Sequence, residues 1–402
     1  MHQLRSYAIV TGAYWSFMLT DGALRMLVLL YFHELGYAPT TLAFLFLFYE
    51  FFGIVTNLFG GWGAQRFGLK ATLIWGLALQ PIALIGLTFM NPEWAPIIAV
   101  PFVMGIQALS GISKDLTKMS AKTAVKFLIP KDQPSLLFKW VAVLTGSKNA
   151  IKGAGFFVGG FLLHQLGFDS ALWVLAAIIL LALASSLLFL PKEIGVTKAK
   201  SKLQGLFDQK REIKILSAAR VFLFGARDIW FVVAIPVFLS STFEWSFTQV
   251  GSFMACWVIG YGAVQAFAPT LLKRFTKGHA PGGKAALTIS LMLTAIMTLI
   301  AVLFSQNIAP HITIVGGLLL FGAVFALNSS VHSFLILDYA DADKAAVNVG
   351  FYYMANAMGR LIGTLFSGLL FQWGGILWAL IGSALFLALT SGITLFLPKR
   401  KH

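Results

Sequence analysis

Long apolar runs alternate with short polar breaks along the whole chain. Each run holds the roughly 20 mainly apolar residues that a helix needs to cross the hydrocarbon core of a bilayer. The breaks contain charged residues, proline and glycine, which mark the ends of such helices. The pattern predicts twelve spans, at residues 7–31, 41–62, 71–90, 97–118, 137–163, 170–190, 215–241, 248–272, 285–305, 312–336, 346–371 and 375–397.

The composition of the 402-residue chain agrees with this interpretation. Hydrophobic residues make up 58% of the sequence and charged residues only 11%, which is too little polar surface for soluble domains of this length. The first run, 7–31, is too long for the apolar part of a signal peptide, so we expect it to be retained. The single cysteine, Cys256, excludes a disulfide framework within the chain. We therefore expect an all-α membrane protein.

The loops between the predicted spans fall into two alternating sets. One set carries the basic residues, at 66–70, 122–131, 192–214, 273–284, 344 and 399–401. The other set contains neither lysine nor arginine, at 32–40, 91–96, 164–169, 242–247, 306–311 and 372–374. Because basic loops stay on the cytoplasmic side, both termini are expected in the cytoplasm. The net charge of +15 is explained by these loops, so no nucleic-acid partner is expected.

The longest polar stretch, 191–214, separates six predicted spans from six others. Two six-helix halves related about the membrane normal are the organisation of major facilitator transporters. The sequence therefore predicts twelve transmembrane helices in two pseudo-symmetric six-helix bundles, the major facilitator fold. The expected divisions are an N-terminal bundle at 1–190, a basic cytoplasmic linker at 191–214 and a C-terminal bundle at 215–402.

The loop after the second predicted span reads GGWGAQRFGLK and resembles the major facilitator signature between helices two and three. In that family, an arginine and an acidic residue of this loop latch the cytoplasmic gate. Gln65 stands here where the acid is usual, which argues against a salt bridge at that point. The alternative is an ordinary turn with basic cytoplasmic residues. The resemblance implies a gating loop that includes Gly61, Arg66, Gly68 and Lys70.

Two further glycine-rich segments do not indicate catalysis. Small residues at 153–160 allow close packing of helices in lipid. The segment 278–285 approaches a phosphate-binding loop, but Ala285 replaces the required Ser or Thr, and a hydrophobic span follows it. The chain also lacks paired-cysteine and His-Glu-x-x-His metal motifs. We expect no enzymatic activity, no cofactor and no bound metal.

Ionisable residues deep inside the spans are the most informative feature of the sequence. Such groups are costly in contact with lipid, so they normally line a pathway or pair with each other. Candidates for proton coupling or charge pairing are Asp21, Glu50 and Asp228. Candidates for substrate binding are Arg25, Lys114, Lys148, Lys152, Arg227, Arg360, Asn149 and Asn356. Because cations outnumber acids, the pattern favours an anionic, multiply charged substrate, and arginine suits oxyanion groups.

Simpler interpretations of the same residues are structural. Asp21 and Arg25 lie four residues apart on one predicted helix and form a pair in this alternative. His332, on the same predicted face as Asn328, is interpreted as a satisfied polar residue between helices. Lys118, Lys122 and Lys126 follow Lys114 at intervals of four. The outer members of this stripe are interpreted as a solvated cytoplasmic face, whereas Lys114 and Lys118 could reach the inner vestibule.

Several strings resemble the ArsJ organoarsenical efflux permeases: TDGALR at 20–25, FYEFFG at 48–53, ALSGISKD at 108–115, KMSAK at 118–122 and LTGSKNAIK at 144–152. The resemblance implies a bacterial inner-membrane exporter whose substrate is 1-arseno-3-phosphoglycerate. We expect the protein to be a monomer. That compound forms when glyceraldehyde-3-phosphate dehydrogenase uses arsenate in place of phosphate. The dehydrogenase is therefore the implied functional partner, because it supplies the substrate.

The chain also resembles organophosphate exchangers of the same superfamily, which use one arginine on helix one and one on helix seven. Arg25 and Arg227 occupy these two predicted helices. We expect them to form a clamp for oxyanion groups in an alternating-access mechanism. Other exporters or exchangers of the superfamily remain the first alternative, and a membrane enzyme or scaffold without transport activity is the second.

Overall fold

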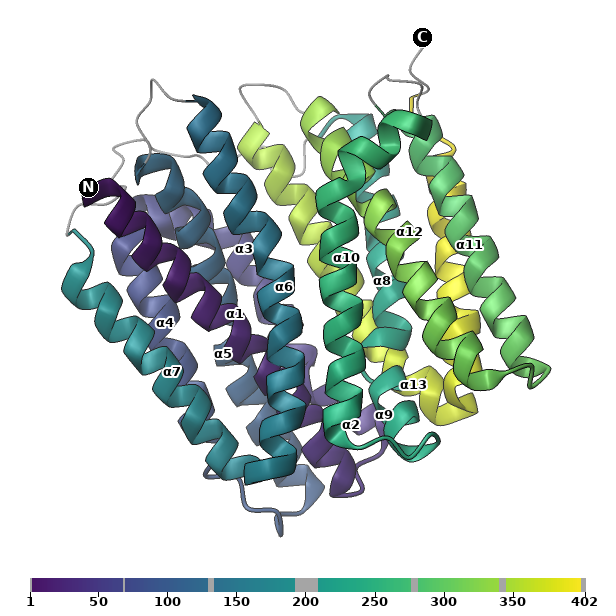
Figure 1. Ribbon diagram of the computed structural model, residues 1–402, viewed down its shortest axis with the longest axis horizontal. Helices are drawn as coiled ribbons and strands as arrows, with labels where there is room; N and C mark the ends of the chain where they lie inside the picture. The colour runs from purple at the N-terminus through teal and green to yellow at the C-terminus, as the bar shows by residue number, and fades with distance from the viewer. Residues whose placement is uncertain are drawn as a thin grey trace. The chain divides into compact units, whose positions relative to one another are not determined.

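The computed structural model describes residues 2–67, 69–128, 134–191, 209–275, 281–339 and 345–398. These residues form helices and contain no strand (Figure 1). The first seven helices are α1 (His2–Glu34), α2 (Pro39–Leu45), α3 (Leu47–Phe67), α4 (Leu69–Leu87), α5 (Pro96–Leu128), α6 (Pro134–Leu166) and α7 (Phe168–Phe189). The others are α8 (Arg211–Phe231), α9 (Ala234–Ser241), α10 (Phe247–Phe275), α11 (Gly283–Ser305), α12 (Pro310–Tyr339) and α13 (Ala345–Thr394).

The observed helices differ from the predicted spans at three places. The second predicted span is interrupted between α2 and α3, and the seventh is interrupted between α8 and α9. The last two predicted spans form the single element α13, which bends at Gly374 and Gly375. Gly375 has a φ of 64°, in the left-handed region that favours glycine. The first two interruptions lie inside predicted spans, and the bend lies where the last two spans were expected to meet. The twelve-span pattern is therefore retained.

The surfaces of the helices agree with a membrane environment. Ten helices in the described residues are long and apolar enough to cross a bilayer. The last of these stretches covers 45 residues, Gly350–Thr394, which is enough for two crossings. On α7, large apolar side chains point outward, with Leu181 71% and Leu188 75% exposed. The protein is therefore an all-α, multi-pass membrane protein, as predicted.

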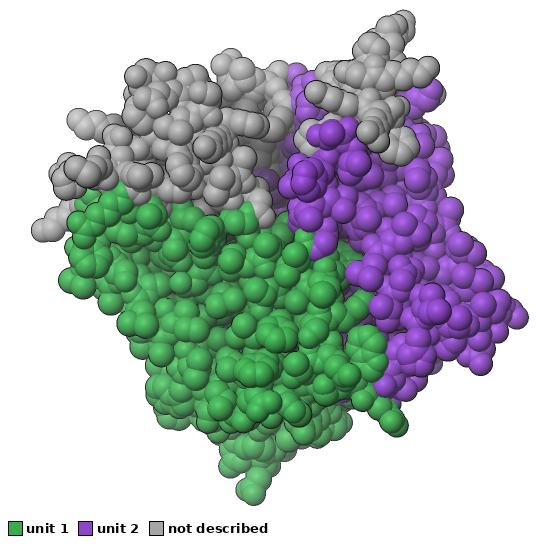
Figure 2. Space-filling view, viewed as in Figure 1, with its two compact units in different colours: residues 1–37, 44–202, 244–259 green, residues 38–43, 203–243, 260–402 purple. Residues whose placement is uncertain are grey.

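The chain divides into two compact units, which Figure 2 shows in different colours. Unit 1 contains Met1–Tyr37, Phe44–Lys202 and Glu244–Ile259, and unit 2 contains Ala38–Ala43, Leu203–Phe243 and Gly260–His402. The domain limits expected from the sequence, 1–190, 191–214 and 215–402, stay a prediction. Most of the expected linker, 192–208, lies outside the described residues.

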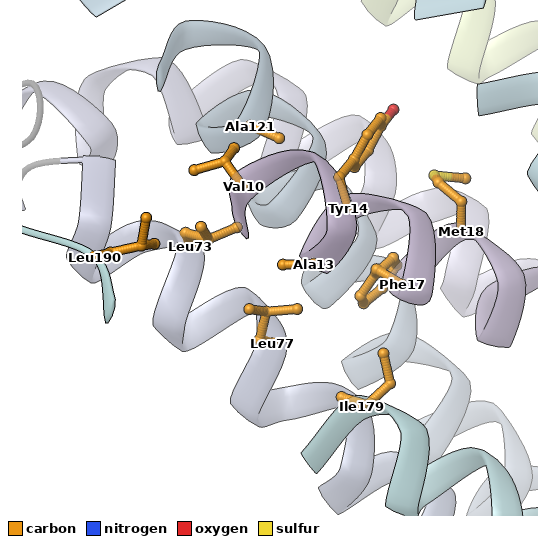
Figure 3. Packing of buried hydrophobic residues seen from close by; sticks show 10 residues of the cluster. All are labelled: Val10, Ala13, Tyr14, Phe17, Met18, Leu73, Leu77, Ala121, Ile179 and Leu190. Carbon is orange, nitrogen blue, oxygen red and sulfur yellow. The ribbon is translucent and has the colours of Figure 1, made fainter. Parts of the chain in front are cut away.

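The core of unit 1 forms around one face of α1. Buried residues of α1 recur at intervals of three and four, the spacing that places side chains on one helical face. They pack against α4, and Ile179 of α7 belongs to the same cluster (Figure 3). The α1 members of this cluster are Val10, Ala13, Tyr14, Phe17 and Met18.

Glycines bring the first helix of each predicted half close to the fifth. In unit 1, a Cβ atom at Gly155 of α6 would overlap the carbonyl oxygen of Leu19 on α1. In unit 2, a Cβ atom at Gly359 of α13 would overlap the carbonyl oxygen of Val221 on α8. The predicted packing role of segment 153–160 is confirmed at Gly155. The same type of contact occurs in both units, as expected for pseudo-symmetric bundles.

Candidate functional site

Arg25 of α1 forms a buried ion pair with Glu50 of α3. The Arg25 Nη2 atom donates to the Glu50 Oε1 atom at 2.6 Å, and the two side chains are only 6% and 1% exposed. The Arg25 guanidinium also lies over the rings of Phe46 and Tyr49, with its Cζ atom 5.3 and 5.1 Å from the ring centroids. The pair joins two helices, so it fixes α1 against α3.

Asp21, one turn before Arg25 on α1, also has partners on other helices. The Lys152 Nζ atom of α6 lies 2.7 Å from the Asp21 Oδ2 atom. The Tyr49 hydroxyl of α3 donates to the Asp21 Oδ1 atom. Asp21 therefore connects α1, α3 and α6. The sequence also allowed an ion pair between Asp21 and Arg25. In the structure, Asp21 contacts Lys152 and Arg25 contacts Glu50, each on a neighbouring helix.

A third carboxylate in unit 1, that of Asp115 on α5, holds two lysines. The Lys114 Nζ atom lies 3.6 Å from the Asp115 Oδ2 atom, and Lys118 donates to the other carboxylate oxygen. Lys118 also donates to the Asn57 side-chain oxygen at 3.1 Å. The Lys114 Nζ atom lies 4.0 Å from the centroid of the Tyr49 ring, which places this group beside Asp21. Asp115 was not among the predicted site residues, although its spacing of three from Lys118 was visible in the sequence.

The remaining candidates of unit 1 are Lys148 and Asn149, which lie on α6 and are half-buried. Lys148 precedes Lys152 by one helical turn, so both residues lie on the same side of α6. The structure thus brings the predicted residues of α1, α3, α5 and α6 into one unit.

In unit 2, one carboxylate holds two arginines. The Arg227 Nε atom donates to the Asp228 Oδ1 atom at 2.6 Å. The Arg360 Nε atom of α13 lies 3.4 Å from the Asp228 Oδ2 atom. Asp228 is buried, whereas the two arginines keep part of their surface exposed. Two arginines thus share one carboxylate, and a bound anion could take over one of these contacts.

Arg220 is a buried cation that the sequence interpretation missed. Its Nε atom donates to the Asn356 side-chain oxygen at 2.9 Å, and its Nη1 atom lies 3.3 Å from the Ser329 Oγ atom. Asn356 was a predicted binding residue, and the structure assigns it this contact. Its spacing from Arg227 could have indicated it, because seven residues are about two helical turns and place both side chains on one face of α8.

Asn328 and His332 of α12 differ in how their polar atoms are used. The Asn328 Nδ2 atom donates to the Ser290 Oγ atom of α11 at 2.9 Å. His332 is fully buried, and within the described part of the chain both of its ring nitrogens lack a hydrogen-bond partner. The interpretation of His332 as a satisfied polar residue is therefore not supported by the contacts of the described residues.

Most of the predicted gating loop cannot be placed. Gly68 lies outside the described residues, as do the surroundings of Gly61 and the side chain of Arg66. Lys70 is described, and its Nζ atom donates to the backbone oxygens of Leu187, at 3.4 Å, and Leu190. These oxygens lie at the C-terminal end of α7, where a cation is favoured by the helix dipole. Lys70 therefore ties α4 to the end of α7.

Across the described residues, buried carboxylates are fewer than the cations around them. The buried carboxylates are Asp21, Glu50, Asp115 and Asp228. The cations that contact them or lie on the same helices within the spans are Arg25, Lys114, Lys118, Lys148, Lys152, Arg220, Arg227 and Arg360. Cations therefore outnumber buried carboxylates within each unit.

Comparison with known families identifies the class of protein. The family model of the Major Facilitator Superfamily matches residues 10–232 and 216–402. The chain belongs to this superfamily. The paired six-helix organisation and the deep charged residues described above are thus features of a superfamily transporter. No curated protein matches the sequence.

Solved structures of superfamily transporters have the same fold. A D-xylose–proton symporter matches with a TM-score of 0.74 and 14% identity, over 99% of this chain and 98% of the other. A mutant of the nucleoside transporter NupG matches with a TM-score of 0.69 and 14% identity, over 98% of each chain. A bacterial homologue of the iron transporter ferroportin matches with a TM-score of 0.70 and 14% identity, over 96% and 98%. At such identities the likeness shows the fold alone.

Proposed function

We propose that this superfamily transporter exports a small organic anion that carries several negative charges, by alternating access. The compound that fits best is 1-arseno-3-phosphoglycerate, which the resemblance to the ArsJ permeases implies. Its phosphate and arsenate groups are both oxyanions. Export of this compound would protect the cell from arsenate, and glyceraldehyde-3-phosphate dehydrogenase would supply it.

The observation that carries the proposal is the sharing of Asp228 by Arg227 and Arg360. Arginine stays protonated in proteins, so the pair cannot become neutral by losing a proton. Its planar guanidinium donates two parallel hydrogen bonds to an oxyanion. An incoming anion would therefore replace Asp228 as the partner of at least one arginine.

The carboxylates give the transporter a means of coupling. When the substrate takes over the contacts of Asp228, the displaced carboxylate can bind a proton, since its charge is then no longer compensated. Asp21 would act in the same way if the substrate drew Lys152 from it. We propose proton coupling through these two residues, with exchange for another anion as the alternative.

Arsenate resistance tests the substrate. Cells that express the protein should gain resistance to arsenate only when the dehydrogenase and its triose-phosphate substrate are present, because only then does the organoarsenical form. The same cells should gain no dehydrogenase-dependent resistance to arsenite. Equal protection from arsenate without the dehydrogenase would contradict the proposed substrate.

A second candidate, exchange of an organophosphate for an inorganic anion, is favoured by the same arginines. Uptake of radiolabelled phosphate, glycerol 3-phosphate and 3-phosphoglycerate into proteoliposomes would separate the two candidates. Rapid exchange of phosphate for an organophosphate would support the second.

We also propose that the protein lies in the bacterial inner membrane with both termini in the cytoplasm, because the loops on one side lack lysine and arginine. Single cysteines at Glu93 and Asp169, in a chain without Cys256, should react with an impermeant thiol reagent outside intact cells. A cysteine at Lys202 should not react, and its labelling in sealed cells would reverse the orientation.

A further inference from the structure

Arg220 carries a positive charge whose partners in the described residues are all neutral. Its side chain is 5% exposed, and its hydrogen bonds go to the Asn356 side-chain oxygen and to Ser329. Its Cζ atom lies 3.8 Å from the centroid of the Phe224 ring. No carboxylate of the described residues lies within ion-pair distance of it. A buried cation of this kind is unfavourable unless an anion binds to it.

A second buried polar side chain lies on α12, the helix that supplies Ser329 to Arg220. His332 follows Ser329 by three residues on α12, so the two side chains lie on one face of the helix. Both ring nitrogens of His332 lack a partner within the described ranges, although the residue is fully buried. Buried polar groups are normally hydrogen-bonded. A ligand with hydrogen-bonding groups next to Arg220 would satisfy this ring.

Arg220 also lies close to the pair of arginines that share Asp228. The Cζ atoms of Arg220 and Arg227 lie 3.8 and 4.8 Å from the centroid of the same ring, that of Phe224. The two guanidinium carbons are thus no farther apart than the sum of these distances. Two charged groups on one short carbon chain can reach both arginines.

We propose that Arg220 binds the second anionic group of the substrate, while Arg227 and Arg360 bind the first. Unit 2 then selects small organic anions with two oxyanion groups over anions with one. This inference rests on the proposed anion transport and adds a specificity-determining residue to it. Each guanidinium offers a forked contact, and both lie against the ring of Phe224.

Binding of two matched anions to the full-length protein in nanodiscs tests this inference. 3-Phosphoglycerate carries a phosphate and a carboxylate, whereas glycerol 3-phosphate carries the phosphate alone. We expect the wild-type protein to bind 3-phosphoglycerate about 10-fold or more tightly, since a charged hydrogen bond contributes about 1.5–3 kcal/mol. The Arg220→Gln change should reduce this preference to about twofold or less. The control Lys214→Gln, which removes an exposed charge from the same helix, should keep the preference.

The Asn356→Asp change provides a test that retains Arg220. Aspartate has nearly the shape of asparagine, and its carboxylate would take the contact that Asn356 now makes with the Arg220 Nε atom. The internal carboxylate should abolish the preference for 3-phosphoglycerate and raise the melting temperature of the ligand-free protein. This variant decides the matter if Arg220→Gln fails to fold.

The outcomes separate this inference from the function on which it rests. If the wild-type protein binds both anions equally, or if both variants keep the preference, Arg220 has only a structural role and the inference is overturned. If the wild-type protein binds neither anion, the proposed anion transport fails, and the inference fails with it.

Discussion

The buried charges of the two units are arranged differently. In unit 1, Arg25 has its own carboxylate, Glu50, and Asp21 is held by Lys152. In unit 2, Arg227 and Arg360 share Asp228, and Arg220 has only neutral partners among the described residues. Unit 1 therefore pairs its arginine with a carboxylate, whereas unit 2 leaves arginine charge in excess.

The difference indicates two roles for buried charges. Those of unit 1 connect helices, whereas the arginines of unit 2 can also contact a ligand. A buried ion pair such as Arg25–Glu50 connects two helices. Lysine can lose its proton when its partner leaves, but arginine cannot. The arginine charge in unit 2 is consequently permanent, and a bound anion would offset it. We assign the main oxyanion contacts to unit 2, and a supporting role to Arg25.

Removal of the shared carboxylate should have the largest effect. The Asp228→Asn change removes the carboxylate that Arg227 and Arg360 share, and breaking a buried ion pair costs about 3–5 kcal/mol. The matched Asp21→Asn change in unit 1 should cost less, because Lys152 can release its proton. Melting temperatures of the purified variants in detergent would check this order. A larger decrease in melting temperature for Asp21→Asn than for Asp228→Asn would contradict the proposed difference between the units.

The Arg25–Glu50 pair should show the behaviour of a structural pair. Either Arg25→Gln or Glu50→Gln removes one member of the buried pair, which should reduce transport and lower the free energy of unfolding by about 3–5 kcal/mol. The double change removes both charges and should restore much of what each single change removes. Transport assays with the single and double variants measure this coupling. If the double variant folds normally and remains inactive, Arg25 contacts the substrate directly.

A smaller effect is expected when Arg227 is replaced by lysine. Arg227→Lys keeps the charge but loses the forked geometry, which should weaken anion affinity about 10- to 150-fold, or about 1.5–3 kcal/mol. The matched change Arg25→Lys should affect affinity less, since its charge is already held by Glu50. Titration of both variants with 3-phosphoglycerate gives the comparison. Equal losses of affinity in the two variants would instead support the symmetrical clamp of Arg25 and Arg227 that the sequence predicts.

Much of the fold could be predicted because lipid imposes a simple rule on the sequence. Every span must be apolar over about 20 residues, and this pattern gave twelve spans whose positions agree with the helices. The bends inside the spans were not predicted. At Gly374 and Gly375 the chain reverses without a polar loop, so hydropathy alone leaves the exact form of the connection open.

The site was predicted in part, because hydropathy identifies buried charges but does not pair them. Asp21 and Arg25 lie one helical turn apart, yet Asp21 pairs with Lys152, 131 residues away, and Arg25 pairs with Glu50, 25 residues away. Arg220 and Asp115 lie nearer the ends of their spans, where a charge resembles an ordinary loop residue. Only the packing of α8 against α13 and of α3 against α5 shows that these residues are buried.

Arsenic uptake into inside-out membrane vesicles tests the central claim most directly. The organoarsenical would be formed outside the vesicles from arsenate, glyceraldehyde 3-phosphate and NAD by added dehydrogenase. We predict that arsenic accumulates only when the transporter and the complete dehydrogenase mixture are both present, and that Arg227→Lys reduces the rate. Accumulation from arsenate alone, or none from the complete mixture with correctly oriented transporter, would contradict the account.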